Sequence, residues 1–414
     1  MHTGERSRLD LARLRTDAQP VSFLLLALLV GMFPWDDALG VPTETVSVVK
    51  LVGAALVAVY ALTTARQAPL RLPLLLLPVG VFLAVVTASL LASGDVGTGL
   101  TKFFRYLLFG SFVFLVVQIV TTRAQLIILA KALTLSGAVA GLVGLVRFFG
   151  SFADRASGPI GDANDFAYVL ATALPLALHL AWRAAGRDRL LWGASAVVLV
   201  SAILGTLSRG ALLALAVAGV WAVVRGRAPT RGVLVSVAVL LALGIAALTF
   251  ERPFIEDRLN AKLTVADENI ESREALWRGA LEMAADHPIL GVGTGLYPKR
   301  AAEYVVDEPF GIVEPVAHNS YLEVLAEGGV LAFLAFAAFV AGTWVVLRRC
   351  HQAARANGDR PTQNLASALQ ASHIVAAVGA VFLSVQIAPP LWLVGGMAAA
   401  LAATMGRRVV AEPA

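Results

Sequence analysis

The sequence predicts an all-α protein that crosses a membrane many times. Of its 414 residues, 58% are hydrophobic and only 15% are charged, and the mean hydropathy is +0.77. A soluble domain carries roughly 25% charged residues, so the composition indicates an integral membrane protein. The single cysteine, Cys350, excludes an internal disulfide bond and a cysteine-based metal site.

The apolar residues form about twelve runs of the length of a membrane-spanning helix, which is about 20 residues. We expect spans at residues 18–34, 46–63, 73–92, 104–121, 125–147, 164–182, 190–207, 210–224, 232–249, 328–347, 367–387 and 389–405. The predicted organisation is nine transmembrane helices in residues 1–249, a large helical outer loop in residues 250–317, and three transmembrane helices with the C-terminal tail in residues 318–414.

Basic residues indicate the orientation of these spans. With the N-terminus inside, most arginines fall in inner segments, whereas the short outer segments hold few basic residues. Those few are Lys102, Arg105, Arg147, Arg155 and Arg209. Because basic residues stay cytoplasmic in short loops, we expect both termini inside and the 250–317 loop outside.

The outer loop has the pattern of a folded segment. Residues 272–286 read as an amphipathic helix that His287-Pro288 ends. Its predicted apolar face consists of Trp277, Ala280, Leu281 and Ala284. The run Gly291 to Gly295 follows this helix rather than a strand, so it predicts a turn and not a phosphate cradle.

His318 lies where the long loop returns to the membrane, in a stretch rich in polar groups, Val316 to Gly329. A neutral imidazole can accept a proton near pH 7, so His318 is a candidate general base. The structural alternative is that this stretch only starts a helix, with Asn319 or Ser320 as its cap. His287, followed by a proline where a helix stops, is a weaker candidate.

Arg209 breaks the positive-inside pattern at a tight hairpin. The apolar run after it, Gly210 to Val224, spans about 22 Å at roughly 1.5 Å per residue, less than the roughly 30 Å of the hydrocarbon core. Arg209 is therefore expected to lie partly sunk below the outer surface, where an unpaired arginine costs several kcal/mol. The alternative is that its side chain reaches up to the headgroups.

Arg273 begins the predicted loop helix, where a cation opposes the helix dipole. Helix N-termini bind anions, so an arginine at this position would suit a phosphate group that binds to both the helix N-terminus and the arginine. Arg278 competes for this role a little over one turn later, and the alternative for Arg273 is an exposed loop charge. Two outer arginines and a histidine would suit diphosphate chemistry, because one guanidinium group can bind two phosphate oxygens at once.

Three further outer features are candidates. Arg155 precedes a polar run in which Asn164 or Asp165 is expected to cap the next span or to contact substrate. Asp36 and Asp37 could hold a metal, but two acids without a third ligand make a weak metal site. We therefore expect no metal and no cofactor.

These motifs together resemble the O-antigen ligase and O-antigen polymerase superfamily. The resemblance is carried by His318-Asn319-Ser320-Tyr321-Leu322-Glu323 with Glu327-Gly328-Gly329, by Arg273-x-x-x-Trp277, by His287-Pro288-Ile289-x-Gly291-x-Gly293, by Gly158 to Asn164 with Phe166-Ala167, and by Ser208-Arg209-Gly210. It covers roughly residues 150–345.

The resemblance implies a GT-C-like glycosyltransferase of the bacterial inner membrane, with residues 250–317 as a periplasmic catalytic loop. Its donor would be a glycan on undecaprenyl diphosphate and its acceptor the lipid A core or a growing glycan, in an inverting, metal-independent reaction with no nucleic-acid partner. By motif position, Arg209 and Arg273 would hold the diphosphate and His318 would be the catalytic base. Substrate contacts are expected from Arg155, Asn164, Asn319, Tyr321 and Arg278.

The alternatives differ in what they require of the chain. A polymerase of the same superfamily would share all these elements. A transporter or lipid-glycan flippase usually carries ionisable residues near the middle of the membrane, whereas no Asp or Glu lies near the middle of a predicted span. A scaffold protein explains no feature better than an enzyme does.

Overall fold

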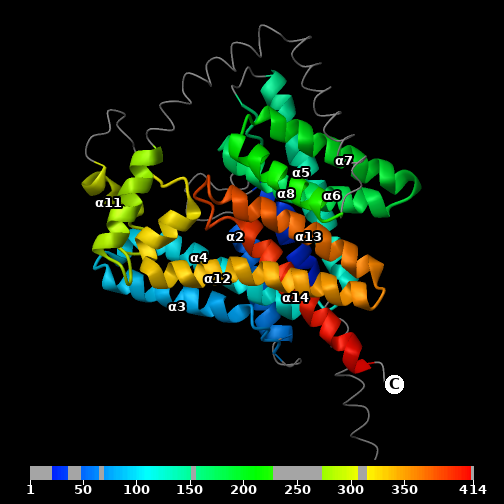
Figure 1. Cartoon of the computed structure of the whole chain (residues 1–414), viewed down its shortest axis with the longest axis horizontal. Helices are drawn as coiled ribbons and strands as arrows, with labels where there is room; N and C mark the ends of the chain where they lie inside the picture. The colour runs from blue at the N-terminus through cyan, green and yellow to red at the C-terminus, as the bar shows by residue number, and fades with distance from the viewer. Residues whose placement is uncertain are drawn as a thin grey trace, which may run out of the picture.

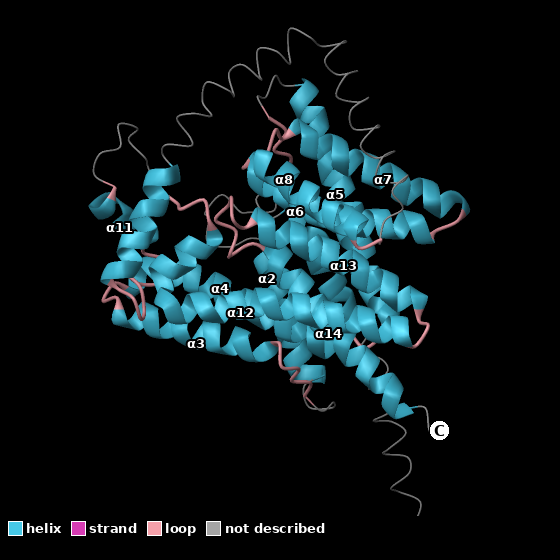
Figure 2. Cartoon of the chain, in the orientation of Figure 1, coloured by secondary structure: helices cyan, strands magenta, loops and turns pink. Residues whose placement is uncertain are grey.

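The computed structural model describes residues 21–35, 48–64, 70–150, 155–226, 273–305 and 315–411. Within these ranges the chain forms helices joined by turns and loops, with no strand (Figure 2). The predicted class of a polytopic all-helical membrane protein is therefore confirmed. The predicted span at 232–249, and Asp36 and Asp37, lie outside the described residues.

The helices follow one another with short connections. In chain order they are residues 21–32, η1 (Phe33–Trp35), α2 (Val48–Val59), η2 (Tyr60–Thr64), α3 (Leu76–Ala92), α4 (Val96–Ile119), α5 (Arg123–Gly150), α6 (Ala163–Arg183), α7 (Gly186–Gly205), α8 (Arg209–Val224), residues 273–286, α11 (Tyr297–Tyr304), α12 (Ser320–Ala356), α13 (Arg360–Gly379) and α14 (Pro389–Ala411).

Six of the described helices are long and apolar enough to cross a membrane by length and composition: α4, α5, α6, α7, α12 and α14 up to Gly406. Four shorter apolar stretches, residues 21–35, 48–63, 76–92 and 209–224, match further predicted spans. Of the twelve predicted spans, ten therefore coincide with apolar helices. α13 is less apolar because it carries Gln363, Gln370 and His373.

The bundle has two ends, because consecutive helices run in opposite directions. At one end, which we call the α11 end, lie α11 and the first residues of α4, α6, α8, α12 and α14. At the other, which we call the Arg360 end, α5, α7 and α13 begin. In Figure 1 α11 lies at the left, and α12 runs from there across the molecule, packed against α3, α13 and α14.

The helix over residues 273–286 and α11 share a small hydrophobic cluster at the α11 end. Ala280 and Met283 of the first helix pack with Tyr297 and Ala301 of α11, and the cluster reaches Ala317 and Ala326 beside and within α12. The predicted helix at 272–286 is thus confirmed and ends before His287, but its predicted face is partly wrong. Leu281 is 52% exposed, because the buried stripe runs one position away from it, through Leu276, Ala280 and Met283.

α12 is interrupted near its start by Gly329, whose φ of 67° is not helical. The interruption frees the carbonyl groups of Ala326 and Glu327, and the N–H groups of Val292 and Gly293 bind them at 2.9 and 3.1 Å. A Cβ atom on Gly329 would lie 2.3 Å from the carbonyl oxygen of Ile289, so only glycine fits. The predicted turn at 291–295 is confirmed, and it packs against the break in α12.

Two predicted boundaries were wrong. α4 begins at Val96, two turns before the predicted 104, because Asp95 caps it by accepting from the N–H of Thr98. Its polar first turns therefore belong to the helix and place Lys102 inside it. α13 begins at Arg360 and ends at Gly379 rather than running from 367 to 387. Residues 380–388 form a non-helical return, and Pro389 then starts α14.

Candidate functional site

His318 stands at the start of α12 in a left-handed backbone conformation, with φ 48°. Among non-glycine residues of the described chain, only His318 and Leu207 have positive φ. Such a conformation costs of order 1 kcal/mol or more and persists only where neighbours hold it. Asn319 follows as the N-cap, accepting from the N–H groups of Tyr321 and Leu322 at 3.0 and 3.1 Å. The predicted cap is therefore confirmed, and it fixes the residue next to His318.

The residue before His318 is held from two sides. The indole Nε1 of Trp277 donates to the carbonyl oxygen of Ala317 at 2.8 Å, and the N–H of Ala317 donates to Oε2 of Glu323 at 3.3 Å. Trp277 lies four residues after Arg273, so both project from the same face of one helix. The contact therefore brings the helix that carries Arg273 against the loop that carries His318.

Arg273 and His318 interact electrostatically. Burial lowers the pKa of His318, and the positive charge of Arg273 lowers it further, while Asp162 and Glu323 act in the opposite direction. Burial likewise lowers the pKa of Arg273, followed by the charge of Arg209; Asp162 raises it and Arg155 lowers it. The three guanidinium groups and the imidazole therefore gather at the α11 end. We call them the arginine–histidine cluster: Arg155, Arg209, Arg273 and His318.

Arg155 joins this cluster through the hairpin between α7 and α8. Its Nε donates to the carbonyl oxygen of Thr206 at 2.7 Å, and its Nη2 donates to Oδ1 of Asn164 at 2.6 Å. Burial lowers its pKa, and the charge of Asp162 raises it. Arg155 thus connects the segment before α6 to the turn that leads into Arg209.

Arg209 is the first residue of α8, directly after the strained Leu207 and the helix N-cap Ser208. Its side chain is exposed. A helix N-terminus presents free N–H groups and a partial positive charge. Arg209 therefore adds its charge at a place already suited to an anion.

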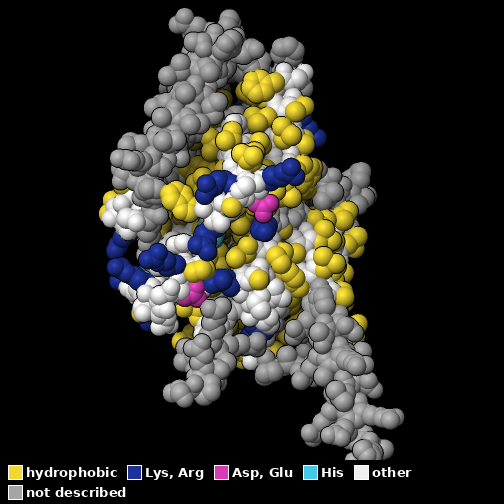
Figure 3. Space-filling model, turned by 90° about the vertical axis from the view of Figure 1, so that its right-hand side faces the viewer, with side chains coloured by type: hydrophobic (Ala, Val, Ile, Leu, Met, Phe, Trp, Pro, Cys, Tyr) yellow, Lys and Arg dark blue, Asp and Glu magenta, His cyan; other side chains and the backbone are white. Residues whose placement is uncertain are grey.

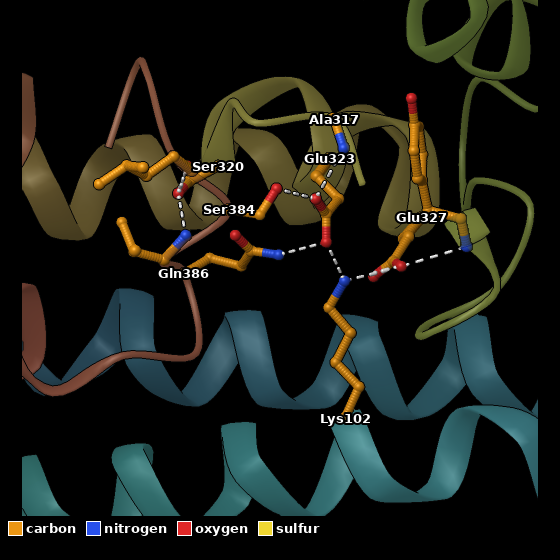
Figure 4. Close-up of polar contacts among 10 residues, drawn as sticks. Lys102, Ala317, Ser320, Glu323, Glu327, Ser384 and Gln386 are labelled. Atoms are coloured by element: carbon orange, nitrogen blue, oxygen red, sulfur yellow. Dashed lines mark hydrogen bonds and ion pairs between the residues drawn. The ribbon is translucent and has the colours of Figure 1, made fainter. Parts of the chain in front are cut away.

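A network of buried charges lies beside the loop that carries His318 (Figure 4). Lys102 of α4 donates to Oε1 of Glu323 and, at 2.8 Å, to Oε1 of Glu327, both on α12. Ser384 and Gln386, from the return before α14, donate to the two oxygens of Glu323, Gln386 at 2.7 Å. The N–H of Tyr297 approaches Oε1 of Glu327 at 3.2 Å. We call Lys102, Glu323 and Glu327 the lysine–glutamate network.

This network holds the loops around His318 in position. Ser320 reinforces it: its N–H and hydroxyl donate to the carbonyl oxygens of Ala380 and Leu383 at 2.9 and 2.7 Å, and it accepts from the N–H of Val385. Glu323 itself binds the backbone of Ala317. Buried ions persist only when they are paired and hydrogen-bonded, so the network makes the position of the His318 loop costly to change.

The remaining predicted site residues have other surroundings. Tyr321 donates from its hydroxyl to the carbonyl oxygen of Ala377 in α13 at 2.9 Å. Asn164 does not cap α6: the cap is Asp162, which accepts from the N–H groups of Asn164 and Asp165. Arg278 is exposed, and its charge is not among those that act on Arg273 or His318.

Lys102, Ser384 and Gln386 are the part of this site that the sequence pattern did not indicate. Lys102 was expected in an outer segment, and the other two inside a span. The sequence does hold one signal of this network. Lys102 lies about two turns inside an apolar helix, and Glu323 and Glu327 lie one turn apart in another. In the described part of the chain, no group of three or more His, Cys, Asp or Glu side chains is arranged to hold a metal ion.

Residues 194–337 match the protein family described as O-antigen ligase. The matched segment includes Arg209, Arg273 and His318, together with both glutamates of the lysine–glutamate network. A search of curated proteins found no match to the chain. The match supports an O-antigen ligase-like superfamily for this chain, and its described helices are those of a polytopic helical membrane protein.

Proposed function

We propose that this protein is a glycosyltransferase that moves a glycan from undecaprenyl diphosphate to an acceptor sugar, with the lipid A core as acceptor. The family match supports an O-antigen ligase- or polymerase-like activity. The observation that carries the finer proposal is that the charge of Arg209 lowers the pKa of Arg273 and the charge of Arg273 lowers the pKa of His318. Residues far apart in the chain thereby supply cations that can bind a diphosphate and a base that can accept the proton of a hydroxyl group.

The arginines take the role of binding the leaving group. Guanidinium groups neutralise charge that develops on a diphosphate as its bond to the anomeric carbon breaks. Arg209 and Arg273 repel each other without an anion between them, and a bound diphosphate removes that repulsion. Arg155 supplies a third positive charge to the same region.

His318 takes the proton of the acceptor hydroxyl. Its lowered pKa keeps the imidazole neutral near pH 7, the form that can accept a proton. The acceptor oxygen attacks the anomeric carbon, the bond from that carbon to the diphosphate breaks, and the electron pair leaves with undecaprenyl diphosphate. One direct displacement inverts the anomeric carbon. The proton on His318 then passes to water.

The sidedness follows from the basic residues in the short loops. Arg123, Arg183, Arg187 and Arg225 lie at the Arg360 end, near or within short connections. By the positive-inside rule this end faces the cytoplasm. The α11 end, with the arginine–histidine cluster, then faces the periplasm of a bacterial inner membrane, and residues 250–317 form the catalytic loop on that side.

Of the remaining predicted contact residues, Arg278 is exposed, whereas Asn164, Asn319 and Tyr321 are buried or half-buried. Arg278 is exposed on the helix of Arg273 and is available to a sugar or phosphate. Asn164, Asn319 and Tyr321 use their side chains in bonds within the protein. Their contribution to substrate binding is proposed to act through the placement of Arg155 and His318.

The product of the reaction tests this function. The full-length protein in proteoliposomes is given a labelled glycan on undecaprenyl diphosphate and lipid A core as acceptor. Label joined to the lipid A core supports the ligase. Longer glycan that stays on undecaprenyl diphosphate identifies the polymerase of the same superfamily instead. Label that crosses the bilayer without a new glycosidic bond contradicts both and identifies a transporter.

A further inference from the structure

A polar hollow lies at the Arg360 end, at the opposite end of the bundle from His318. It is formed between α8, α12 and α13 and has a volume of about 560 Å³. Figure 3 faces this end and shows Lys and Arg side chains gathered across the middle of the face, with few acidic side chains among them. Neither the arginine–histidine cluster nor the lysine–glutamate network contributes a lining residue.

Among the described residues, the hollow is lined by three arginines and by no acidic residue. Arg225 comes from the C-terminal end of α8, and Arg348 and Arg355 come from α12. Arg348 and Arg355 are seven residues apart, so they share one face of the helix, with His351 between them. None of the three arginines forms an ion pair within the described residues.

The acidic residue that lies nearest to Arg355 in the sequence, between α12 and α13, already has partners of its own. Asp359 accepts from Arg123 at 3.1 Å and caps α13 by accepting from the N–H of Thr362 at 3.0 Å. It does not line the hollow. Among the described residues, three positive charges therefore converge on one concave space without a carboxylate to neutralise them, which suits a ligand with a phosphate group.

One wall of the hollow is apolar. Trp221 of α8 and Trp344 of α12 meet edge to face, with ring centroids 5.6 Å apart. Beside them α8 presents a row of exposed valines one turn apart: Val217, Val220 and Val224, the last two 63% and 75% exposed. Tryptophan is enriched at the membrane–water interface, so the hollow opens at the level of the lipid headgroups.

We propose that this hollow is a binding site for an anionic phospholipid. Arg225, Arg348 and Arg355 bind the phosphate of the headgroup, and an acyl chain lies along the valine row of α8. The ring of His351 is held in place by Ser367 at 3.0 Å from its Nδ1, which keeps this part of the wall fixed. Free phosphate would use the arginines but not the valine row, so the combination of both favours a lipid.

The test measures lipid binding to the purified full-length protein by native mass spectrometry. Phosphatidylglycerol is compared with phosphatidylcholine, whose headgroup has no net charge, and with inorganic phosphate alone. Each basic residue near an anionic surface contributes about a factor of five in affinity. The variant Arg225→Gln/Arg348→Gln/Arg355→Gln is therefore expected to bind phosphatidylglycerol roughly 100-fold more weakly.

The matched control removes the same charge from the same end of the bundle. Arg183, Arg349 and Arg360 are exposed there and do not line the hollow, so the variant Arg183→Gln/Arg349→Gln/Arg360→Gln should lose much less affinity. The single variant Arg348→Gln, expected to lose about fivefold, decides the matter if the triple variant does not fold. Equal losses of lipid affinity in both triple variants would mean that the lipid is attracted to the charged surface in general. Inorganic phosphate that binds as tightly as phosphatidylglycerol would mean that the hollow is a site for free phosphate. Either result overturns the proposal.

Discussion

The indole of Trp277 donates a hydrogen bond of 2.8 Å to the carbonyl oxygen of Ala317, the residue that precedes His318. This bond joins the helix that carries Arg273 to the loop that carries His318, two parts of the chain 40 residues apart. In the proposed reaction the arginine holds the leaving group and the histidine takes a proton from the attacking group. The bond therefore sets the distance between the two halves of the reaction.

Replacing Trp277 by phenylalanine keeps the ring and removes the donor. The carbonyl group of Ala317 loses a partner, at a cost of about 1–3 kcal/mol, and His318 is less firmly placed. We expect the transfer rate to fall by roughly 10- to 100-fold while KM for the donor changes little. Leu281→Ala, at an exposed position of the same helix, is the control and should keep the wild-type rate. An unchanged rate in Trp277→Phe would show that this bond does not position the base.

The pH dependence of transfer should depend on Arg273. The ordinary pKa of histidine is 6.5, and burial together with Arg273 lowers that of His318. The neutral base thus persists to lower pH, and the rate falls only as the pH drops through the lowered pKa. Arg273→Gln removes a positive charge, so the pKa of His318 rises and this fall moves to higher pH, besides a general loss of rate. Arg300→Gln, in α11, where the arginine side chain is 41% exposed and paired with Glu303, should leave the pH profile in place. The same profile in both variants would contradict the proximity of Arg273 and His318.

Arg209 tests whether a forked cation is needed. Arg209→Lys keeps the charge but cannot bind two phosphate oxygens in a plane. We expect the transfer rate with undecaprenyl-diphosphate-linked donor to fall by at least roughly 10-fold, in the range of a lost charge-assisted hydrogen bond. Full activity of the lysine variant would instead support the view that this side chain only reaches to lipid headgroups.

The lysine–glutamate network should dominate the stability of the α11 end. Lys102→Met leaves two buried carboxylates without their cation, which costs about 3–5 kcal/mol for a broken buried pair. Thermal unfolding in detergent measures the loss. Lys299→Met breaks the exposed pair with Asp95 and should cost less than about 1 kcal/mol.

A compensating variant separates charge from packing at Lys102. Lys102→Met combined with Glu323→Gln and Glu327→Gln has no buried charge left unpaired, so it should regain part of the lost stability. If the combined variant is no more stable than Lys102→Met alone, the cost at Lys102 comes from its packing and not from its charge.

Local chemistry explains which features could be predicted from the sequence. The stop at His287-Pro288, the cap at Asn319 and the turn at Gly291–Gly295 each depend on neighbouring residues, and each was predicted. The apolar runs likewise located ten of the spans as apolar helices. The face of the loop helix was harder, because both Leu281 and Met283 satisfy a helical period and only the packing against α11 decides between them.

Contacts between distant segments could not be predicted in this way. Lys102 and Glu323 are 221 positions apart, and no local period relates them. Ser384 and Gln386 lie in an apolar stretch that satisfies the length of a span, yet they leave the helix to bind Glu323. The sequence pattern did not single out Asp162, although it caps α6 and acts on both His318 and Arg273.

The most direct test is the transfer of labelled glycan from undecaprenyl diphosphate by the variant His318→Ala, measured beside binding of the same donor. His287→Ala is the matched control, since His287 is exposed at the same end of the bundle. We expect that His318→Ala binds donor but forms no product, and that His287→Ala transfers at the wild-type rate. Product formation by His318→Ala at or near the wild-type rate would show that His318 is not the catalytic base.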